Sequence, residues 1–341
     1  MKSSLATVVF LAAYAVNADS RVEKRDAALT DADILNFALT LEHLEATFYS
    51  EGLQKYDQNT FTNAGFSTAT RAAIQKISDD EASHVSFLTS ALQAAGATPV
   101  QACKYTFPYT DVKSFLAVSQ ILEGVGVSAY LGAAASIQNP GYLTAAASIL
   151  TVEARHNAYV RFVNGDSPFP AAFDTPVGPR GVVTLATPFF SSCPNGSAPG
   201  LQGFPAVNIT GKITPGSTLS ISAANATGAT TCAFLSGLNT TTSSYSNGQC
   251  QVPSDGKVGN GQIYVFLTNG PNVTDATTVA GPGIMETETP GSMQPIGGGG
   301  MNSTTGPNGA ADRATSGATS IRGASMILAS FSAAVASYIF M

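Results

Sequence analysis

Tryptophan is absent from this sequence, and histidine occurs only three times in 341 residues. Charged residues make up 11% of the chain, well below the roughly one quarter that is typical of soluble domains. The net charge is −6, and no basic stripe of the kind that binds nucleic acid is present. The composition therefore excludes nucleic acid as an expected partner.

Cysteine is also sparse: the chain has only Cys103, Cys193, Cys232 and Cys250. None of them lies in a Cys-x-x-Cys pair, which argues against a zinc site. Four cysteines instead suit disulfides in an oxidising compartment, and three pairings are possible. Joining Cys232 to Cys250 is the most local choice, and it leaves the other two cysteines to connect the two halves of the chain.

The N-terminal end has the features of a secretory signal. Residues 1–18 combine a charged start, a short apolar run and a small-residue site, so we expect cleavage after Ala18. The apolar run is too short to span a membrane. Residues 19–29 follow as a short segment, in which Lys24-Arg25 is either a dibasic processing site or an exposed basic pair.

The C-terminal end also carries an apolar run. Residues 326–341 follow a polar spacer, and this order is typical of a GPI signal whose tail is removed. Small residues at Asn308 or Ser316 suit the attachment point. The alternative is a transmembrane anchor, for which the run is short. We therefore predict a secreted protein that a lipid anchor holds at the cell surface or cell wall.

Residues 30–168 show the apolar spacing of helices. The expected helices cover about 31–52, 68–95, 110–138 and 141–163. The connection between the second and third of them has about fifteen residues, which could span the length of a helical bundle. Such a connection permits a bundle with one long crossover.

Residues 177–280 lose the helical spacing and are rich in Gly, Pro, Ser, Thr and Asn, which predicts a small β-sandwich-like domain. The expected strands include 182–185, 207–209, 218–221 and 262–267. Residues 281–325 predict a disordered stalk rich in Gly, Ser and Thr. Glycosylation sequons predict a glycosylated distal half, and they begin at Asn195, Asn208, Asn225, Asn239, Asn272 and Asn302.

Two of the three histidines follow a glutamate by three residues. Glu81 precedes His84 and Glu153 precedes His156, each in an expected helix. At this spacing, glutamate and histidine lie on one face of the helix. A Glu-x-x-His pair on each of two helices, with a glutamate from each of the other two, is how a four-helix bundle binds a pair of metal ions.

The first and third expected helices offer the two remaining carboxylates. Glu42 lies in the first, and Glu123 is a lone carboxylate in the apolar third, where burial is costly unless it is paired or metal-bound. Glu45 either shares the site or supports it. Tyr49 and Tyr130 follow the two glutamates by seven residues, so each shares a face with its glutamate and could hydrogen-bond a ligand or carry an electron.

Each of these residues has an ordinary explanation when taken alone. Glu81 could belong to a solvated acidic patch, and the two histidines could be half-buried core residues. The ordered set, with a contribution from every expected helix, instead favours a metal site. Carboxylate oxygens and imidazole nitrogen suit two Fe or Mn ions as cofactors, with O₂ or peroxide as their reaction partner.

The motif at residues 36–49, Asn-Phe-Ala-Leu-Thr-Leu-Glu-His-Leu-Glu-Ala-Thr-Phe-Tyr, resembles the first helix of the secreted ferritin-like domain proteins of fungi. These include stress-response and late-sexual-development proteins, and plant desiccation-related proteins are similar. The resemblance covers roughly residues 28–170 and implies an all-α ferritin-like four-helix bundle, here followed by the β-sandwich-like domain and the stalk. It implies a di-iron site at Glu42, Glu45, Glu81, His84, Glu123, Glu153 and His156. It supplies neither a reaction nor catalytic residues.

Three functions follow as hypotheses. The first is a surface protein that uses a di-iron or di-manganese centre in oxidative or stress-related chemistry. The second is a structural or adhesive cell-wall glycoprotein whose bundle keeps its ligands for stability alone. The third is iron storage, which suits an anchored single chain least because storage requires a self-assembling shell.

Overall fold

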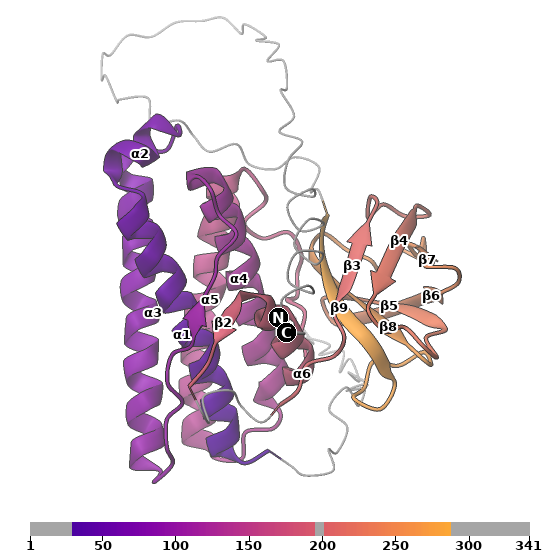
Figure 1. The fold of residues 1–341 in the computed structure, drawn as a ribbon, viewed down its shortest axis with the longest axis horizontal. Helices are drawn as coiled ribbons and strands as arrows, with labels where there is room; N and C mark the ends of the chain where they lie inside the picture. Colours follow the sequence, from indigo (N-terminus) through magenta and orange to yellow (C-terminus); the bar gives the residue numbers. More distant parts are fainter. Residues whose placement is uncertain (1–28, 195–200, 288–341) are drawn as a thin grey trace, which may run out of the picture.

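The computed structural model describes residues 29–194 and 201–287. The expected signal peptide, dibasic site and C-terminal anchor signal lie outside these residues, as does the stalk beyond position 287. The same holds for Asn195, Asn302, Asn308 and Ser316. The described chain forms a helical half that packs beside a β-rich half (Figure 1).

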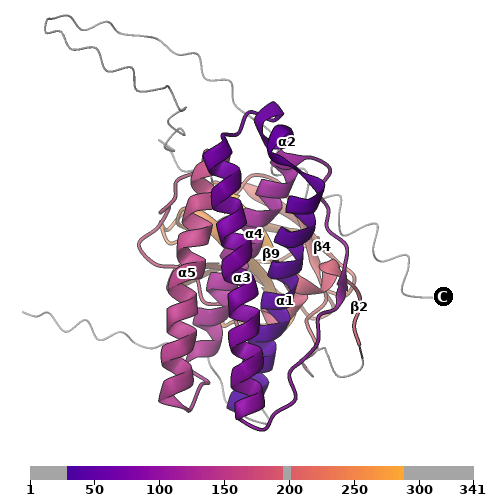
Figure 2. The ribbon, with the colours of Figure 1, turned by 90° about the vertical axis from the view of Figure 1, so that its left-hand side faces the viewer.

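Four long helices form the first half, and each begins at a residue whose side chain accepts a backbone N–H. They are α1 (Asp31–Lys55), α3 (Thr68–Ala94), α4 (Val112–Ala134) and α5 (Pro140–Asn164). Figure 2 looks onto α3, with α1 and α5 on its two sides and α4 behind. A short helix, α2 (Gln58–Asn63), lies in the loop expected after α1.

The direction of the helices requires one long crossover. Arg71 of α3 donates a hydrogen bond to the backbone carbonyl of Leu53, near the end of α1. Asn36, near the start of α1, donates a hydrogen bond to the backbone carbonyl of Thr98, which follows α3. Helix α1 is therefore antiparallel to α3. It is also antiparallel to α4, because Tyr49 contacts Glu123 and Glu42 contacts Tyr130. Helices α3 and α4 thus run the same way, and residues 95–111 cross the length of the bundle.

A disulfide fixes this crossover. Its strand β1 (Lys104–Tyr105) pairs with β2 (Phe190–Ser192), and Cys103 is bonded to Cys193 beside them. The second disulfide joins Cys232 to Cys250. The sequence makes Cys232 with Cys250 the most local pair and leaves Cys103 for Cys193, and both disulfides agree with this pairing.

Two antiparallel sheets form the β-rich half. One has the order β3-β4-β7, with β3 (Val207–Thr210), β4 (Thr218–Ala223) and β7 (Gln249–Gln251). The other has the order β6-β5-β8-β9, with β6 (Asn239–Ser244), β5 (Thr231–Ser236), β8 (Gly261–Thr268) and β9 (Thr278–Thr287). The strands expected at 207–209, 218–221 and 262–267 are therefore confirmed.

The four-stranded sheet is a middle layer, and its two faces have different partners. Successive side chains of a strand point to opposite faces. Ile263 and Val265 of β8 pack in the core shared with the other sheet, whereas Tyr264 and Phe266 pack in the core of the bundle. This double burial explains why β8 is an almost continuous apolar run.

Helix α4 is the element that joins the two halves. The Tyr264 hydroxyl donates to the Gly124 carbonyl at 3.1 Å and lies 2.8 Å from Ser128 Oγ. Val177 donates its backbone N–H to the carbonyl of Ser128. Helix α4 is long and apolar enough to cross a membrane, but 72% of its most apolar window is buried inside the protein. It is therefore explained as a core helix.

Three expectations from the sequence are wrong in this part of the chain. Residues 182–185 are not a strand but part of helix α6 (Pro179–Ala186), which packs between α4 and β9. Residues 281–287 do not belong to a stalk, because they complete β9. Helix α1 does not end at Gly52, because that glycine packs against the ring of Phe115 and the helix continues to Lys55.

Candidate metal centre

The seven residues expected at the metal site all lie near the middle of the four long helices. Helix α1 contributes Glu42 and Glu45, α3 contributes Glu81 and His84, α4 contributes Glu123, and α5 contributes Glu153 and His156. None of them is more than 9% exposed. The bundle thus encloses five carboxyl groups and two imidazoles in one place.

Six of these residues bring ligand atoms within 4.8 Å of one another in two groups. Glu42, Glu81, His84 and Glu153 form the first group, and Glu81, Glu123, Glu153 and His156 form the second. Glu81 and Glu153 belong to both groups. Glu42 and Glu123 each belong to one group, and their side chains are called the end carboxylates below.

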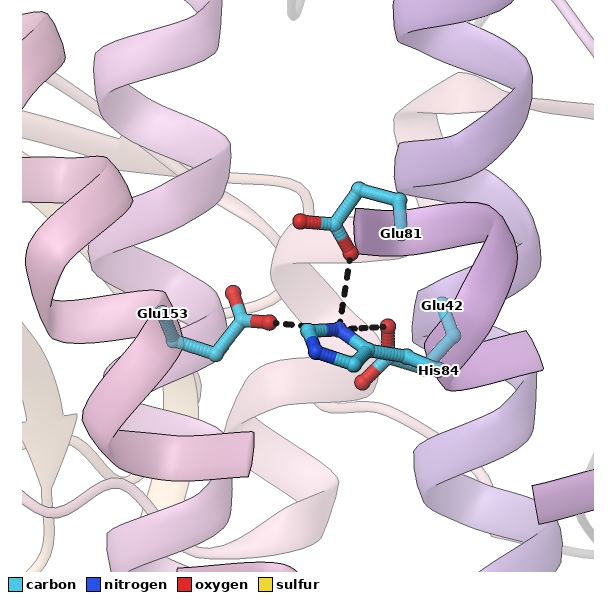
Figure 3. Close-up of side chains that lie close together, drawn as sticks. All are labelled: Glu42, Glu81, His84 and Glu153. Carbon is cyan, nitrogen blue, oxygen red and sulfur yellow. Dashed lines mark hydrogen bonds and ion pairs between the residues drawn. The ribbon is translucent and has the colours of Figure 1, made fainter. Parts of the chain in front are cut away.

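The first group surrounds one ring nitrogen of His84 (Figure 3). His84 Nδ1 lies 3.2 Å from a Glu42 oxygen, 3.4 Å from a Glu81 oxygen and 3.2 Å from a Glu153 oxygen. The second group repeats the pattern, with His156 Nδ1 at 2.9 Å from Glu81 and 3.5 Å from Glu123. The two halves of the centre are related by an approximate twofold arrangement.

Burial of so many acids changes their protonation. Burial raises the pKa of Glu42 to about 8, against the lowering effect of His84. Burial raises the pKa of Glu45 and Glu153 as well, and the neighbouring carboxylates raise it further. For Glu81 the two imidazoles outweigh burial and lower the pKa to about 2. A buried cluster of this kind needs cations, either protons or metal ions.

The imidazoles respond in the opposite direction. Burial by itself would lower the pKa of His84, but the surrounding carboxylates outweigh it and raise the pKa to about 12. The same balance raises the pKa of His156 to about 11. Without metal ions the two histidines therefore carry protons, which metal ions would have to displace.

Several ligand atoms are buried without a hydrogen-bond partner in the described part of the chain. These atoms are Glu81 Oε1, Glu123 Oε2, both oxygens of Glu153 and Nδ1 of His156. Most of them meet an oppositely charged group at ion-pair distance, whereas Glu153 Oε2 has neither a hydrogen bond nor an ion pair among the described residues. A buried atom without a partner costs free energy unless something binds it. Hard oxygen donors with imidazole nitrogen suit Fe and Mn, so this donor set is compatible with the binding of such ions.

Glycine at position 126 makes room for the carboxylates. A Cβ atom there would lie 3.0 Å from Glu153 Oε2 and 3.1 Å from Glu45 Oε1. Glu45 therefore lies beside Glu153, although it belongs to neither group of ligand atoms.

Two tyrosines hold the end carboxylates by crossing between helices. Tyr49 of α1 donates to Glu123 of α4, and Tyr130 of α4 donates to Glu42 of α1. The seven-residue spacing predicts that each tyrosine lies near the glutamate of its own helix. In the structure each tyrosine instead forms a hydrogen bond with the glutamate of the other helix. Ser119 also lies 2.6 Å from the Tyr49 hydroxyl.

Sequence reasoning missed Ser119 and Asp80 as supporting residues. Asp80 Oδ2 lies 3.4 Å from Nε2 of His156, so it contacts the ring nitrogen that faces away from the centre. The nearest signal in the sequence is its position beside Glu81, where a solvated acidic patch is the ordinary alternative to a metal site. His43, the third histidine, lies 3.2 Å from the carbonyl oxygen of Val100 in the crossover.

Four of the predicted glycosylation sites lie in the described β-rich half. Asn225, Asn239 and Asn272 are exposed, and Asn208 is half-buried on β3. Their positions are compatible with attachment of a glycan at the surface.

Comparison with known proteins agrees with this geometry. Residues 30–166 match the family model described as ferritin-like domain. Protein rds1 of Schizosaccharomyces pombe is 27% identical over 180 residues, an alignment that covers 52% of this chain. It covers 44% of the relative, so this chain spans less than half of that protein's length. Residues 30–166 are thus similar to a ferritin-like domain, and the chain is distantly similar to a fungal protein.

Proposed function

We propose that the ferritin-like domain of residues 30–166 binds two iron or manganese ions and takes part in oxidative chemistry. The observation that carries the proposal is the pair of buried ligand groups that share Glu81 and Glu153. Exposed acidic residues often cluster without a metal ion, but these are buried, and Glu153 Oε2 has no donor among the described residues.

Each ligand has a role in this proposal. Glu81 and Glu153 would help to hold both ions, while Glu42 with His84 and Glu123 with His156 would hold one ion each. Two ions held there would supply redox chemistry towards dioxygen or peroxide. Tyr49 and Tyr130 fix the end carboxylates, because each donates its hydroxyl hydrogen to one of them.

We further propose that the protein acts outside the cell, held by a lipid anchor at the surface or wall. The support comes from the signal-like residues 1–18, the anchor-like residues 326–341 and the sequons. The two disulfides are consistent with this, because such bonds persist in oxidising compartments.

A structural or adhesive wall glycoprotein is the second candidate. The exposed sequons at Asn225, Asn239 and Asn272 favour it, because a glycan-covered β-rich half suits a spacer or adhesive module. In that case the buried centre would serve stability alone. Substrate turnover that is lost in His156→Ala would exclude a purely structural role.

Metal analysis of the purified protein tests the main proposal. We expect close to two Fe or Mn ions per chain, and at least about tenfold weaker binding in Glu123→Ala, because an end ligand is lost. The matched control is Glu51→Ala, which removes an exposed carboxylate from α1 and should keep the full metal content. A wild type without either metal, or an unchanged content in Glu123→Ala, would contradict the proposal.

A further inference from the structure

A loop between α5 and α6 exposes apolar side chains at the protein surface. We infer that this apolar loop, residues 169–173, inserts into the surface of a neutral lipid bilayer. The inference rests on the proposed lipid anchor and deepens it, because it names the part of the protein that faces the membrane.

The apolar loop has the sequence Phe-Pro-Ala-Ala-Phe, five consecutive residues without a polar side chain. Phe169 is 70% exposed and Phe173 is 62% exposed, the highest values for large apolar side chains in the described residues. Ala171 and Ala172 between them are exposed as well. Neither ring belongs to a hydrophobic core cluster. Single apolar residues are normal at a surface, whereas a contiguous exposed group of them marks a binding site.

Both ends of the apolar loop are fixed, so its rings are held at the surface. Arg161, near the end of α5, donates from Nε to the carbonyl of Ser167 at 2.7 Å and pairs with Glu286 of β9 at 2.8 Å. On the other side of the loop, Gly237 donates its backbone N–H to Thr175 Oγ1 at 2.7 Å. The four-stranded sheet and α5 thus position the loop as a rigid scaffold positions a binding loop.

The described chain ends beside the apolar loop. A Cβ atom at Gly261 would lie 2.6 Å from Pro170 Cγ, and Gly261 pairs with Thr287, the last described residue. Asn308, the nearer of the two predicted attachment points, comes 21 residues after Thr287, and such a length reaches at most about 75 Å. An anchored chain would therefore keep the loop near the bilayer, and this closeness raises the effective concentration of lipid at the loop.

The charge around the apolar loop selects the class of lipid. Residues 162–179 contain no Lys or Arg, and Asp166 and Asp174 flank the loop. Anionic lipids attract clusters of basic residues, which this segment lacks. Apolar side chains can instead enter the boundary between headgroups and acyl chains of any bilayer. A neutral bilayer, such as one of phosphatidylcholine, therefore fits the loop better than an anionic one.

The predicted glycan at Asn239 would extend from the other face of the four-stranded sheet. Asn239 and Thr241 are two residues apart on β6, so their side chains share a face. Thr241 pairs with Phe234, which packs in the core shared with the three-stranded sheet. The apolar loop instead follows α5, on the side of the bundle. Glycosylation at Asn239 is thus compatible with a bilayer at the loop.

Tryptophan fluorescence tests the insertion directly, because the chain has no tryptophan of its own. We would mix the full chain carrying Phe173→Trp with phosphatidylcholine vesicles that contain brominated acyl chains. Bromine should quench at least about half of the emission, because the ring would lie about 5–10 Å into the boundary. Phe87→Trp is the matched control, since Phe87 is 48% exposed but lies on α3, on the side of the bundle away from the β-rich half (Figure 1). Its emission should stay unchanged.

Loss of both rings should weaken the association with vesicles. In the double variant Phe169→Ser and Phe173→Ser, partition of the full chain onto the same vesicles should fall at least about tenfold, because two exposed apolar side chains are lost. Its Tm should match that of the wild type, because neither ring belongs to a core cluster. An equal partition of the two proteins would contradict the inference.

The outcomes separate the apolar loop from the anchor. Full chain that carries a lipid and binds vesicles, yet shows no quenching at position 173, would overturn the inference and leave the anchor standing. Full chain in which mass spectrometry finds no lipid, but in which position 173 is quenched, would refute the anchor and support the inference. A blue shift at position 173 without vesicles, together with a dimer in sizing chromatography, would assign the loop to contact with a second copy and overturn the inference.

Discussion

At the scale of single residues, the main feature of the centre is the number of ionisable side chains that it buries. Five glutamates lie together with almost no exposure, and isolated carboxylates are very costly to bury. Two divalent ions would neutralise most of that charge, and hydrogen bonds from Tyr49 and Tyr130 offset part of the remainder. Without metal ions, bound protons must neutralise the carboxylates, and the stability of the protein then depends on pH.

We predict that the metal-free protein loses stability as the pH rises from about 5 to about 8. The raised pKa values of Glu42, Glu45, Glu123 and Glu153 mean that the folded chain binds more protons than the unfolded chain above pH 4.5. Stability falls with pH wherever the folded state holds the extra protons. The raised pKa values of the two histidines act in the same direction above pH 6.5. Glu81 does not contribute in this window, because its lowered pKa leaves it ionised in both states.

Thermal unfolding of chelator-treated protein would show this trend as a falling Tm. Added Mn²⁺ should raise Tm most at the higher pH, because the ligands then hold fewer protons for the metal to displace. A metal-free Tm that rises across the same range would refute this account of the centre.

The clustering of the six residues could be predicted from the sequence, because it depends largely on local spacing. A Glu-x-x-His pair fixes two side chains on one helix face without knowledge of the fold. Asp80 and Ser119 could not be found in this way. Their roles depend on which residues of a different helix come opposite them, namely His156 and Tyr49.

At the scale of elements, α4 has two faces with different tasks. Glu123, Gly126 and Tyr130 face the centre, whereas Gly124, Ser128 and Gly132 recur every fourth residue and face the β-rich half. Small residues on the second face let the neighbouring backbone approach closely. The carbonyl oxygen of Val177 would lie 1.9 Å from a Cβ atom at position 132.

We predict that Gly132→Ala destabilises the protein by about 1–3 kcal/mol, the usual cost of overpacking where backbone must shift. Urea unfolding of the full chain would measure the change. Gly270→Ala is a suitable control, because an added methyl there meets no atom within 4 Å. Equal stability of the two variants would mean that the contact between α4 and residue 177 adjusts without cost.

The elements themselves were predictable where one periodicity dominates. The long helices and the strands at 207–209, 218–221 and 262–267 follow their apolar patterns. Residues 182–185 have an apolar run that suits either a strand or a short helix, and packing between α4 and β9 makes it helical. Strand β6, with the sequence Asn-Thr-Thr-Thr-Ser-Ser, carries almost no apolar signal and is specified by pairing with β5.

At the scale of the whole molecule, the crossover is held to the β-rich side by one covalent bond. The disulfide between Cys103 and Cys193 spans 90 residues, and that loop includes α4 and α5. We predict that replacing both cysteines by serine lowers the free energy of unfolding by about 2–5 kcal/mol. Denaturant titration measures this loss.

The same double variant should still bind metal at low temperature, because the six ligands lie on helices that do not include either cysteine. Metal content is therefore the control for correct folding. Unchanged stability after removal of the bond would show that the pairing of β1 with β2 suffices to hold the crossover.

The burial of α4 under the β-rich half also has a consequence for the order in which the chain is made. Tyr264, which bonds Gly124 and Ser128 on the back of α4, is synthesised 140 residues after Gly124. At ordinary translation rates, that interval lasts on the order of 10 s. During this time the nascent chain carries an apolar helix whose covering sheet does not yet exist. The face of α4 that contacts Tyr264 is therefore covered only after the β-rich half has emerged.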